Sequence, residues 1–402
     1  MKIFFITPKL NFVSSGGSPD EYDLTYRTLQ EIGHEIFVYT TNPEANDMPY
    51  KLPYPVFEED VHSHGQFGIQ KGVFKILRKY SDKADCFFVD GQVFLYGAGL
   101  YRKFGGKVPV VAYFNRELPA WSENVSQFLP KEKDGFLKKI KKQARFYIER
   151  YIFMPFVNYI DVICFANPLL EKPYNEFGLK TSGKSFIFGD PFNYRGLMKE
   201  HGIKEDTYRK RNKTSGPFTI FYSSRMAPSK GFDLLLVAFS KLKNKDNFHL
   251  VLGGTGPEEQ AIKKLVSDLR LESYVEMPGW MTKTELYDRF KKTDIYVQAQ
   301  WRKEVTAMSL MTAVMFGLPS IVPGDTALEW VAQKGALCFN DGDADDLAQK
   351  IEQLSNDHEL RAELSRQCYI RMDAPELNHE NRIKLLSDKM IEAVNKNKQL
   401  TF

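Results

Sequence analysis

The stretch FTIFYSSRMAPSKGFDLLLVAFSKL, residues 218–242, contains a strand, a loop and a helix in the order that builds a parallel α/β sheet. FTIFYSS is rich in β-branched and aromatic residues, which favours a strand. The apolar spacing that follows predicts a helix beginning near Phe232. Arg225 and Lys230 therefore lie in a loop at the carboxyl end of a strand, where open α/β sheets bind ligands.

These two cations suit a negatively charged ligand. The guanidinium of Arg225 offers a planar fork of donors, and the ammonium of Lys230 is a mobile point charge. Such a pair can hold a diphosphate and stabilise the negative charge of a departing leaving group. The same pattern also fits two solvated surface cations, and the loop by itself leaves both interpretations open.

Strands alternate with helices along the whole chain, which predicts parallel sheets. The predicted strands are KIFFI, EIFVYTT, CFFVD, PVVAYF, DVICFA and SFIF in the first half, then FTIFYSS, HLVLGG, DIYVQAQ and PSIVPG in the second. Between them, a polar and basic stretch with little apolar periodicity predicts a linker. We therefore expect an N-terminal Rossmann-like domain at 1–195, a linker at 196–216, a C-terminal Rossmann-like domain at 217–375, and a C-terminal helix at 376–402 packing on either domain.

Composition restricts the classes of protein to which the chain can belong. Its 402 residues are enough for two domains with separate cores, and 43% hydrophobic residues favour a globular protein. A net charge of +4 does not by itself indicate nucleic-acid binding. The N-terminus lacks the apolar core of a signal peptide, and four widely spaced cysteines favour a reducing compartment. We expect a cytoplasmic protein, either soluble or peripheral to a membrane.

A second candidate site lies in KEVTAMSLMTAVMFGLP, residues 303–319. Apolar residues cover almost every face of the predicted helix, which indicates burial, and Gly317 with Pro319 predicts its end. Glu304 precedes this helix, whose first amides would bind an anion well. Glu304 could satisfy those amides itself or could face a ligand, and both interpretations stay open.

Together these stretches resemble the family-4 glycosyltransferases of the two-domain GT-B type. The resemblance is strongest over residues 219–331, where four motifs occur in the family's order: S-R-x4-K-G, G-x-G-P-E, V-x-x-P-G-W and E-x7-T-A-x-x-x-G-x-P. It implies an α/β GT-B fold with two Rossmann-like domains facing each other across a cleft. It also implies a retaining transfer from a nucleotide sugar that needs no metal and no other cofactor.

Carried over to this sequence, the family's pattern assigns roles to particular residues. Arg225 and Lys230 would hold the donor diphosphate, and Glu304 would bond the hydroxyls of the donor sugar. The remaining donor-binding residues would be Gly16 and Gly17 against the phosphates, Gly279 and Trp280 beside the base, and the first turn formed by Thr306, Ala307, Met308 and Ser309.

The sequence departs from the family at two of its site positions. Thr312 stands where a second glutamate usually reaches the ribose hydroxyls, and Asn115 stands where a histidine usually lies near the donor sugar. A threonine offers one neutral hydroxyl in place of a carboxylate, and an asparagine cannot exchange a proton near neutral pH.

We therefore expect a metal-independent glycosyltransferase that moves a sugar to a glycan or lipid-linked acceptor in cell-surface polysaccharide or glycoconjugate synthesis. The departures at Thr312 and Asn115 favour a second hypothesis, a catalytically silent GT-B module that binds a nucleotide sugar or supports a partner enzyme. Nucleic acid is not an expected partner.

Two other patterns are better explained by structure than by metal binding. DGDADDLAQKIE, residues 341–352, contains D-x-D and part of a calcium-loop pattern, but Asp346 stands where that loop needs glycine. Asp343 instead fits a helix N-cap. His62 and His64 are isolated and fit surface residues.

The turn at Gly253, Gly254 and Gly256 does not match the dinucleotide-binding fingerprint.

The stretch GFLKKIKKQARFYIERYIF, residues 135–153, predicts a basic amphipathic helix at 136–152. Apolar residues form a helical stripe, while lysines and Arg145 occupy the other faces. The helix could lie on an anionic membrane, or it could bury its stripe in the core of its own domain.

Overall fold

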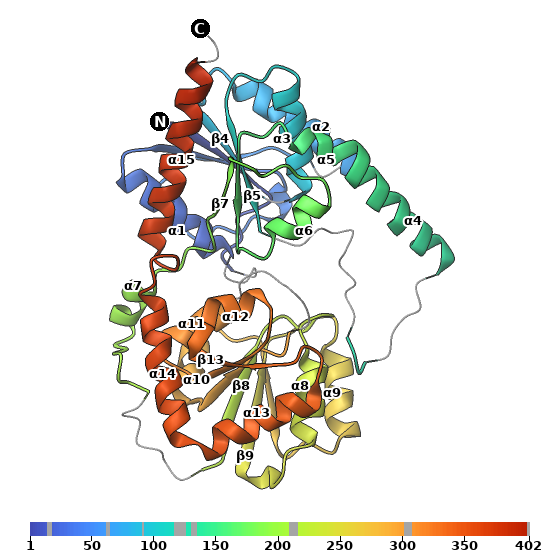
Figure 1. Cartoon of the computed structure of the whole chain (residues 1–402), viewed down its shortest axis with the longest axis vertical. Coiled ribbons are helices and arrows are strands. Elements are labelled where there is room, and N and C mark those ends of the chain that lie inside the picture. Colours follow the sequence, from blue (N-terminus) through green and yellow to red (C-terminus); the bar gives the residue numbers. More distant parts are fainter. Residues whose placement is uncertain are drawn as a thin grey trace. The chain divides into compact units, whose positions relative to one another are not determined.

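The computed structural model describes residues 1–13, 18–61, 65–90, 92–115, 126–129, 135–208, 216–300 and 308–399. The chain divides into two compact units, each built around its own sheet (Figure 1). The N-terminal unit comprises residues 1–122, 134–192 and 378–402, and the C-terminal unit comprises residues 123–133 and 193–377. Both units have the α/β architecture that the alternating strands and helices predict.

Seven strands form the sheet of the N-terminal unit over the residues that the structure describes, in the order β3-β2-β1-β4-β5-β6-β7. All neighbours are parallel. Central strands of such a sheet are covered on both faces, and accordingly every residue of β4 and β5 is buried. The strands are β1 (Lys2–Thr7), β2 (Glu35–Thr40), β3 (Val56–Glu58), β4 (Cys86–Asp90), β5 (Val110–Phe114), β6 (Val162–Phe165) and β7 (Ser185–Ile187).

Helices connect these strands and cover the sheet (Figure 1). They are α1 (Ser18–Glu31), α2 (Gly65–Tyr80), α3 (Gln92–Lys103), α4 (Phe136–Tyr147), α5 (Met154–Val157), α6 (Glu171–Glu176) and, from the end of the chain, α15 (His379–Gln399). A π-helical turn, Ile148–Phe153, joins α4 to α5.

The C-terminal unit repeats the arrangement with six parallel strands in the described part of its sheet, ordered β10-β9-β8-β11-β12-β13. The strands are β8 (Phe218–Ser223), β9 (Phe248–Gly253), β10 (Val275–Gly279), β11 (Ile295–Val297), β12 (Ser320–Pro323) and β13 (Ala336–Phe339). The helices are α7 (Tyr194–Glu200), α8 (Phe232–Ser240), α9 (Glu259–Asp268), α10 (Lys283–Lys292), α11 (Met308–Met315), α12 (Ala327–Ala332), α13 (Ala344–Asn356) and α14 (His358–Met372).

Both strand orders reverse direction beside their first strand, between β1 and β4 in one unit and between β8 and β11 in the other. Loops that leave such a switch point diverge to opposite faces of the sheet and open a crevice at the carboxyl ends of the strands. The topology therefore places a candidate binding edge in each unit.

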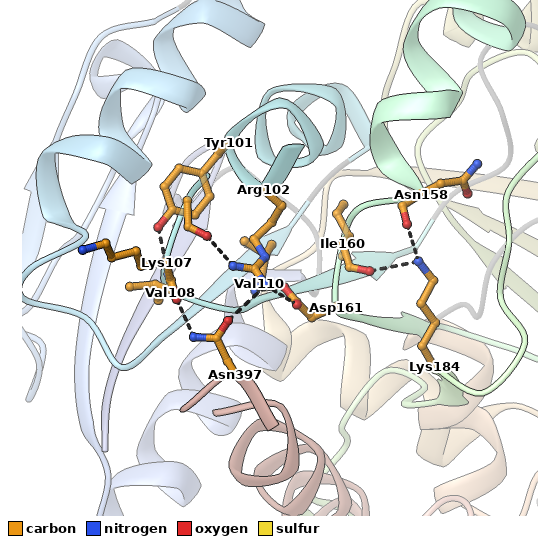
Figure 2. A network of polar contacts seen from close by, with 11 residues as sticks. Tyr101, Arg102, Lys107, Val108, Val110, Asn158, Ile160, Asp161, Lys184 and Asn397 are labelled. Carbon is orange, nitrogen blue, oxygen red and sulfur yellow. Dashed lines mark hydrogen bonds and ion pairs between the residues drawn. The ribbon is translucent and has the colours of Figure 1, made fainter. Parts of the chain in front are cut away.

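The C-terminal helix α15 belongs to the N-terminal unit, although the sequence allowed it to pack on either domain. The side chain of Asn397 accepts a hydrogen bond from Arg102 at 3.2 Å and donates one to the backbone oxygen of Lys107 at 2.5 Å (Figure 2). Arg102 also pairs with Asp161 at 2.6 Å. Nearer the start of α15, the His34 ring and the Ser387 hydroxyl lie 2.8 Å apart. These contacts hold the end of the chain on the unit that contains its beginning.

Two predicted boundaries are wrong. Residues 196–200 of the predicted linker belong to α7, which Asn193 caps by accepting a hydrogen bond from the Gly196 amide at 2.9 Å. The chain leaves the N-terminal unit after residue 192 rather than 195, and Arg195 pairs with Asp373 of the C-terminal unit at 2.6 Å.

A short segment of the first half also belongs to the C-terminal unit. Ser126 donates to the Glu258 carboxylate at 2.6 Å, and the Phe128 amide donates to Asp233 at 2.7 Å. The predicted N-terminal domain of residues 1–195 is therefore interrupted. These residues lack the apolar periodicity from which a domain is recognised, so only the folded contacts assign them.

Helix α4 keeps its apolar stripe out of the core. Phe136 is 78% exposed, Leu137 is 73% exposed and Ile140 is 46% exposed. Figure 1 shows α4 extending away from the sheet of its own unit. The interpretation that this stripe packs into the core of the domain is therefore wrong. Within the described residues, none of the helices has the length and apolar character needed to span a bilayer.

Candidate functional site

The loops that follow β8, β9 and β11 pack directly against one another. Gly231 has a left-handed φ of 68°, and a Cβ there would lie 1.8 Å from the Ala299 carbonyl oxygen. Gly254 has a φ of 108°, and its Cβ would lie 2.0 Å from the Ser224 oxygen. Any side chain at these glycines would separate the loops. The three loops, residues 224–231, 254–258 and 298–300, form what we call the cationic edge.

Arg225 and Lys230 both lie on this edge. Arg225 is exposed at the end of β8, and Lys230 is half-buried. The Lys230 ammonium lies 3.4 Å from the side-chain oxygen of Gln300, and the Lys230 backbone oxygen accepts a hydrogen bond from the Tyr222 hydroxyl at 2.7 Å. The structure thus brings the loop that carries both cations against the end of β11. A diphosphate placed there would meet both positive charges.

Helix α11 follows the cationic edge in the chain and is buried, as its composition predicts. Leu310, Met311 and Val314 are each at most 1% exposed. Gly317 ends the helix with a φ of 66°, and the Leu318 amide returns to the Ala313 oxygen at 3.0 Å. Met308 and Ser309 form its first described turn. Three predicted site residues, Glu304, Thr306 and Ala307, lie outside the described residues.

Thr312 lies inside α11 and is 6% exposed. Its hydroxyl donates to the Met308 carbonyl oxygen of the same helix at 2.8 Å. The hydroxyl proton of Thr312 is therefore used within the helix.

The predicted turn at Gly279 and Trp280 ends β10, the strand beside β9. Gly279 has a φ of 79°, and its carbonyl oxygen accepts a hydrogen bond from the Gly254 amide at 2.7 Å. The Trp280 side chain is 58% exposed. The turn is thereby joined to the cationic edge, and it presents a large aromatic ring to solvent.

Comparison with known proteins agrees with this geometry. Residues 204–371 match the family model of "Glycosyl transferases group 1", and this match contains the whole cationic edge. The chain carries a group 1 glycosyltransferase domain.

Curated relatives of this glycosyltransferase are distant. Alpha-monoglucosyldiacylglycerol synthase from Streptococcus pneumoniae is 22% identical over 327 residues, which cover 78% of this chain and 70% of that protein. The lipopolysaccharide core biosynthesis glycosyltransferase LpsE from Rhizobium meliloti is 23% identical over 250 residues, 62% of this chain and 68% of the relative.

Solved structures show that the glycosyltransferase has the GT-B fold. Anabaena HepE in complex with UDP superposes with a TM-score of 0.70 at 14% identity, covering 98% of this chain and all of that chain. The predicted family and fold, two Rossmann-like domains of GT-B type, are therefore confirmed.

The N-terminal unit of the glycosyltransferase carries a different set of groups at the carboxyl ends of its strands. Asn115 follows β5, and its amide nitrogen donates to the Asp90 carboxylate at the end of β4 at 2.9 Å. Asp90 is 2% exposed. The Tyr113 hydroxyl donates to Asp190, which follows β7. Together with Glu21 of α1, these residues form what we call the acidic edge.

The pKa of Asp190 is raised to about 6, mainly by burial and in smaller part by the nearby Asp90 carboxylate. The Tyr113 hydrogen bond and the Arg382 charge oppose this rise. Burial, followed by the charges of Asp190 and Asp90, holds the pKa of Glu21 well above its ordinary value. The acidic edge therefore contains carboxyl groups whose pKa values are raised by burial and by neighbouring carboxylates.

Sequence reasoning identified Asn115 but missed Asp90, Asp190 and Glu21. Asp90 gave a usable signal, since it is an acid that ends the apolar strand CFFVD. Asp190 and Glu21 gave none, because they are distant in sequence and only the sheet order brings them to Asp90. Gly16 and Gly17, in the segment before α1, lie outside the described residues.

The D-x-D stretch begins a helix, as predicted. Asp343 caps α13 by accepting hydrogen bonds from the amides of Asp345 at 2.9 Å and Asp346 at 3.0 Å. Across the ranges that the structure describes, no group of three acids, histidines or cysteines is arranged to hold a metal ion. His62 and His64 fall outside those ranges.

Proposed function

We propose that this glycosyltransferase moves a sugar from a nucleoside diphosphate donor to a hydroxyl of a glycan or lipid-linked acceptor, with retention of anomeric configuration. The observation that carries the proposal is the cationic edge, where Gly231 and Gly254 allow backbone contact and bring the loop of Arg225 and Lys230 beside Gln300. UDP-sugars are the first donors to test, since the Anabaena HepE structures contain UDP and UDP-glucose.

The proposed reaction needs charge stabilisation more than it needs a strong base. The bond between the anomeric carbon and the donor phosphate breaks, and the acceptor oxygen bonds to that carbon on the same face. The acceptor proton passes to an oxygen of the departing phosphate. Arg225 and Lys230 stabilise the negative charge on the diphosphate, so the proposal requires no metal. Glu304 and the amides of Thr306 to Ser309 keep the roles that the family resemblance gives them.

The acidic edge suits the acceptor rather than the donor. Buried carboxyl groups would repel a diphosphate but can accept hydrogen bonds from neutral hydroxyls. The Asn115 side-chain oxygen is buried and has no hydrogen-bond partner among the described residues, which supports a role in binding a hydroxyl. Synthesis of a cell-surface polysaccharide or glycoconjugate is consistent with the names of the Streptococcus and Rhizobium relatives.

A thermal-shift panel tests the proposed donor site. Wild type and Arg225→Ala are heated with UDP, GDP, ADP and CDP and with the corresponding nucleotide sugars, because a ligand that binds the native state stabilises it by mass action. We expect at least one of these compounds to stabilise the wild type and to stabilise Arg225→Ala less. If no nucleotide shifts the wild type, or if the variant responds equally, the assignment of the donor site is wrong.

The second candidate, a catalytically silent nucleotide-sugar module, is favoured by two contacts. The Thr312 hydroxyl is bonded within α11, and Asn115 is bonded to Asp90. Such a module would give the same thermal shifts as the enzyme. It would release no nucleoside diphosphate from any nucleotide sugar, with or without a glycan or glycolipid acceptor.

We also propose that α4 binds an anionic membrane surface that carries the acceptor. Its exposed apolar residues are flanked by Lys139 and Lys141, which are both exposed. Apolar side chains that enter the lipid boundary and cations that meet the head groups are the two elements of an interfacial helix.

Sedimentation with vesicles tests this contact. We expect the wild type to bind phosphatidylglycerol-containing vesicles and to bind phosphatidylcholine vesicles weakly. Lys139→Glu with Lys141→Glu should lower binding to the anionic vesicles by at least about thirtyfold, since each cation near the surface contributes about 1 kcal/mol and two are lost. The matched control changes the exposed Lys291 and Lys292 of α10 to glutamate. Equal losses in both variants would show a general charge effect and contradict a specific role for α4.

A further inference from the structure

A row of buried polar side chains leads from Tyr296 to Lys230. Tyr296, Gln298 and Gln300 occupy alternate positions of β11 and its continuation, so they share one face of the strand. Tyr296 is fully buried, and Gln298 and Gln300 are each 1% exposed. Buried amides are costly unless their groups are bonded. These side chains satisfy that requirement by bonding to one another.

The hydrogen bonds run in one direction along the row. The Tyr296 hydroxyl donates to the Gln298 side-chain oxygen at 3.2 Å. The Gln298 amide then donates to the Gln300 side-chain oxygen at 3.0 Å.

The Gln300 side-chain oxygen ends the row, because it accepts hydrogen bonds from two groups. Gln298 donates to it at 3.0 Å, and the Lys230 ammonium donates at 3.4 Å. An amide oxygen has two lone pairs and can accept both of these hydrogen bonds. Gln298 therefore fixes the orientation of the Gln300 amide, and that orientation decides which atom faces Lys230.

The backbone makes this contact possible. A Cβ at Gly231 would lie 1.8 Å from the Ala299 oxygen, so the loop after β8 approaches the end of β11 only because residue 231 is glycine. Lys230 and Gln300 are the neighbours of these two residues in the chain. The close approach and the row of amides thus act at the same point of the cationic edge.

The geometry points to Gln300 and Gln298 as positioning residues for Lys230, and this inference rests on the proposed function. A lysine side chain is flexible, and ordering it on ligand binding costs conformational entropy. A neutral amide oxygen can orient the ammonium without adding a negative charge that would repel the donor phosphates.

A double-mutant cycle on nucleotide binding tests the inference. The probe is whichever of UDP, GDP, ADP and CDP stabilises the wild type most, and calorimetry gives its dissociation constant for wild type, Gln300→Leu, Lys230→Met and the double variant. We expect Gln300→Leu to weaken binding about tenfold, as for a lost hydrogen bond to a charged group. If Gln300 acts through Lys230, the double variant should bind as Lys230→Met does.

Two further variants separate positioning from stability. Gln298→Leu leaves an acceptor for Lys230 but removes the group that orients it, so binding should weaken less than in Gln300→Leu. The control is Thr293→Val, which removes a fully buried hydroxyl that donates to Arg289 in the same unit at 2.8 Å. It should lower the melting temperature and leave the dissociation constant unchanged.

The outcomes distinguish this inference from the proposed function. If Lys230→Met weakens binding but Gln300→Leu does not, or if the two losses add, Gln300 does not position Lys230 and only the inference is wrong. A loss in Thr293→Val as large as that in Gln300→Leu would also overturn it. If Lys230→Met binds as the wild type does, or if no probe binds the wild type, the donor site and the inference are both wrong.

Discussion

The two units of this chain share a topology but carry opposite chemistry at the carboxyl ends of their strands. Each sheet reverses its strand order beside its first strand, which fixes where loops converge. At the cationic edge, Arg225 and Lys230 accompany neutral buried amides. At the acidic edge, Asp90 and Asp190 are buried with tyrosine and asparagine partners. The fold thus fixes the position of each candidate site, and the side chains decide which ligand each can bind.

The difference divides the proposed reaction between the two units. A diphosphate carries concentrated negative charge and would be stabilised by the cations of the cationic edge. A glycan offers neutral hydroxyls, which donate to carboxylates and amide oxygens and are also compatible with a protonated acid. The three substitutions below test this division, starting with the largest expected effect.

Glu304 is the acid that the sequence predicts beside the cationic edge, and it tests whether that position binds sugar or phosphate. Glu304→Gln should lower sugar transfer about a hundredfold, because a charge-assisted bond formed to the reacting sugar is lost. Binding of the nucleoside diphosphate, which lacks the sugar, should stay the same. The measurements are turnover with a nucleotide sugar and calorimetry with the diphosphate. Tighter diphosphate binding with unchanged turnover would show that Glu304 repels phosphate and does not orient the sugar.

Asp190 tests the acidic edge through the pH dependence of stability. The pKa of its carboxyl is near the ordinary value of 3.8 in the unfolded state and about 6 in the folded state. As pH rises, the Asp190 carboxyl therefore loses its proton in the unfolded state before it does so in the native state. The free energy of unfolding falls as a result between about pH 4 and about pH 6. Asp190→Asn removes this loss, which at about 1.4 kcal/mol per pKa unit amounts to at most about 3 kcal/mol.

The measurement is the urea midpoint of wild type and Asp190→Asn at pH 4 and pH 7. The asparagine can still accept the hydrogen bond of Tyr113. The urea midpoint of the variant should therefore rise relative to that of the wild type between pH 4 and pH 7. Two neighbouring charges, those of Asp90 and Arg382, act on Asp190. Both are present in the wild type and in the variant. An equal pH dependence in the two proteins would contradict a raised pKa of Asp190.

Thr312 tests whether an added acid near the cationic edge improves donor binding. Thr312→Glu should tighten binding of the nucleoside diphosphate about tenfold, since a carboxylate accepts two charge-assisted bonds from the ribose diol. A 2′,3′-dideoxy diphosphate serves as the control, because it lacks both hydroxyls and should gain nothing. Unchanged or weaker binding of the ribose-bearing nucleotide would mean that Thr312 does not face the ribose.

Local sequence predicted the strands well because they are continuous apolar runs. CFFVD coincides with β4 at Cys86–Asp90, and FTIFYSS contains β8 at Phe218–Ser223. Helix α7 was missed because YRGLMKE has little apolar periodicity and begins at a cap rather than at a hydrophobic run.

The chemistry of the site was only partly readable from the sequence. Arg225 and Lys230 share one loop, so a short motif reveals them. The raised pKa of Asp190 depends on its burial and on residues far away in the chain, because the Asp90 charge adds to the rise and the Arg382 charge of α15 opposes it. The row from Tyr296 to Gln300 is visible as alternating polar residues, but its contact with Lys230 depends on how closely Gly231 approaches Ala299.

Release of the nucleoside diphosphate from a nucleotide sugar most directly tests whether the cationic edge catalyses sugar transfer. Wild type and Lys230→Met are each incubated with UDP-, GDP-, ADP- and CDP-sugars, with and without glycan and glycolipid acceptors. We predict that the wild type releases the diphosphate from one of these donors. Lys230→Met should release it about a hundredfold more slowly, as expected when one preorganised stabilising group is removed. Equal rates in the two proteins, or no release from any donor, would contradict the account.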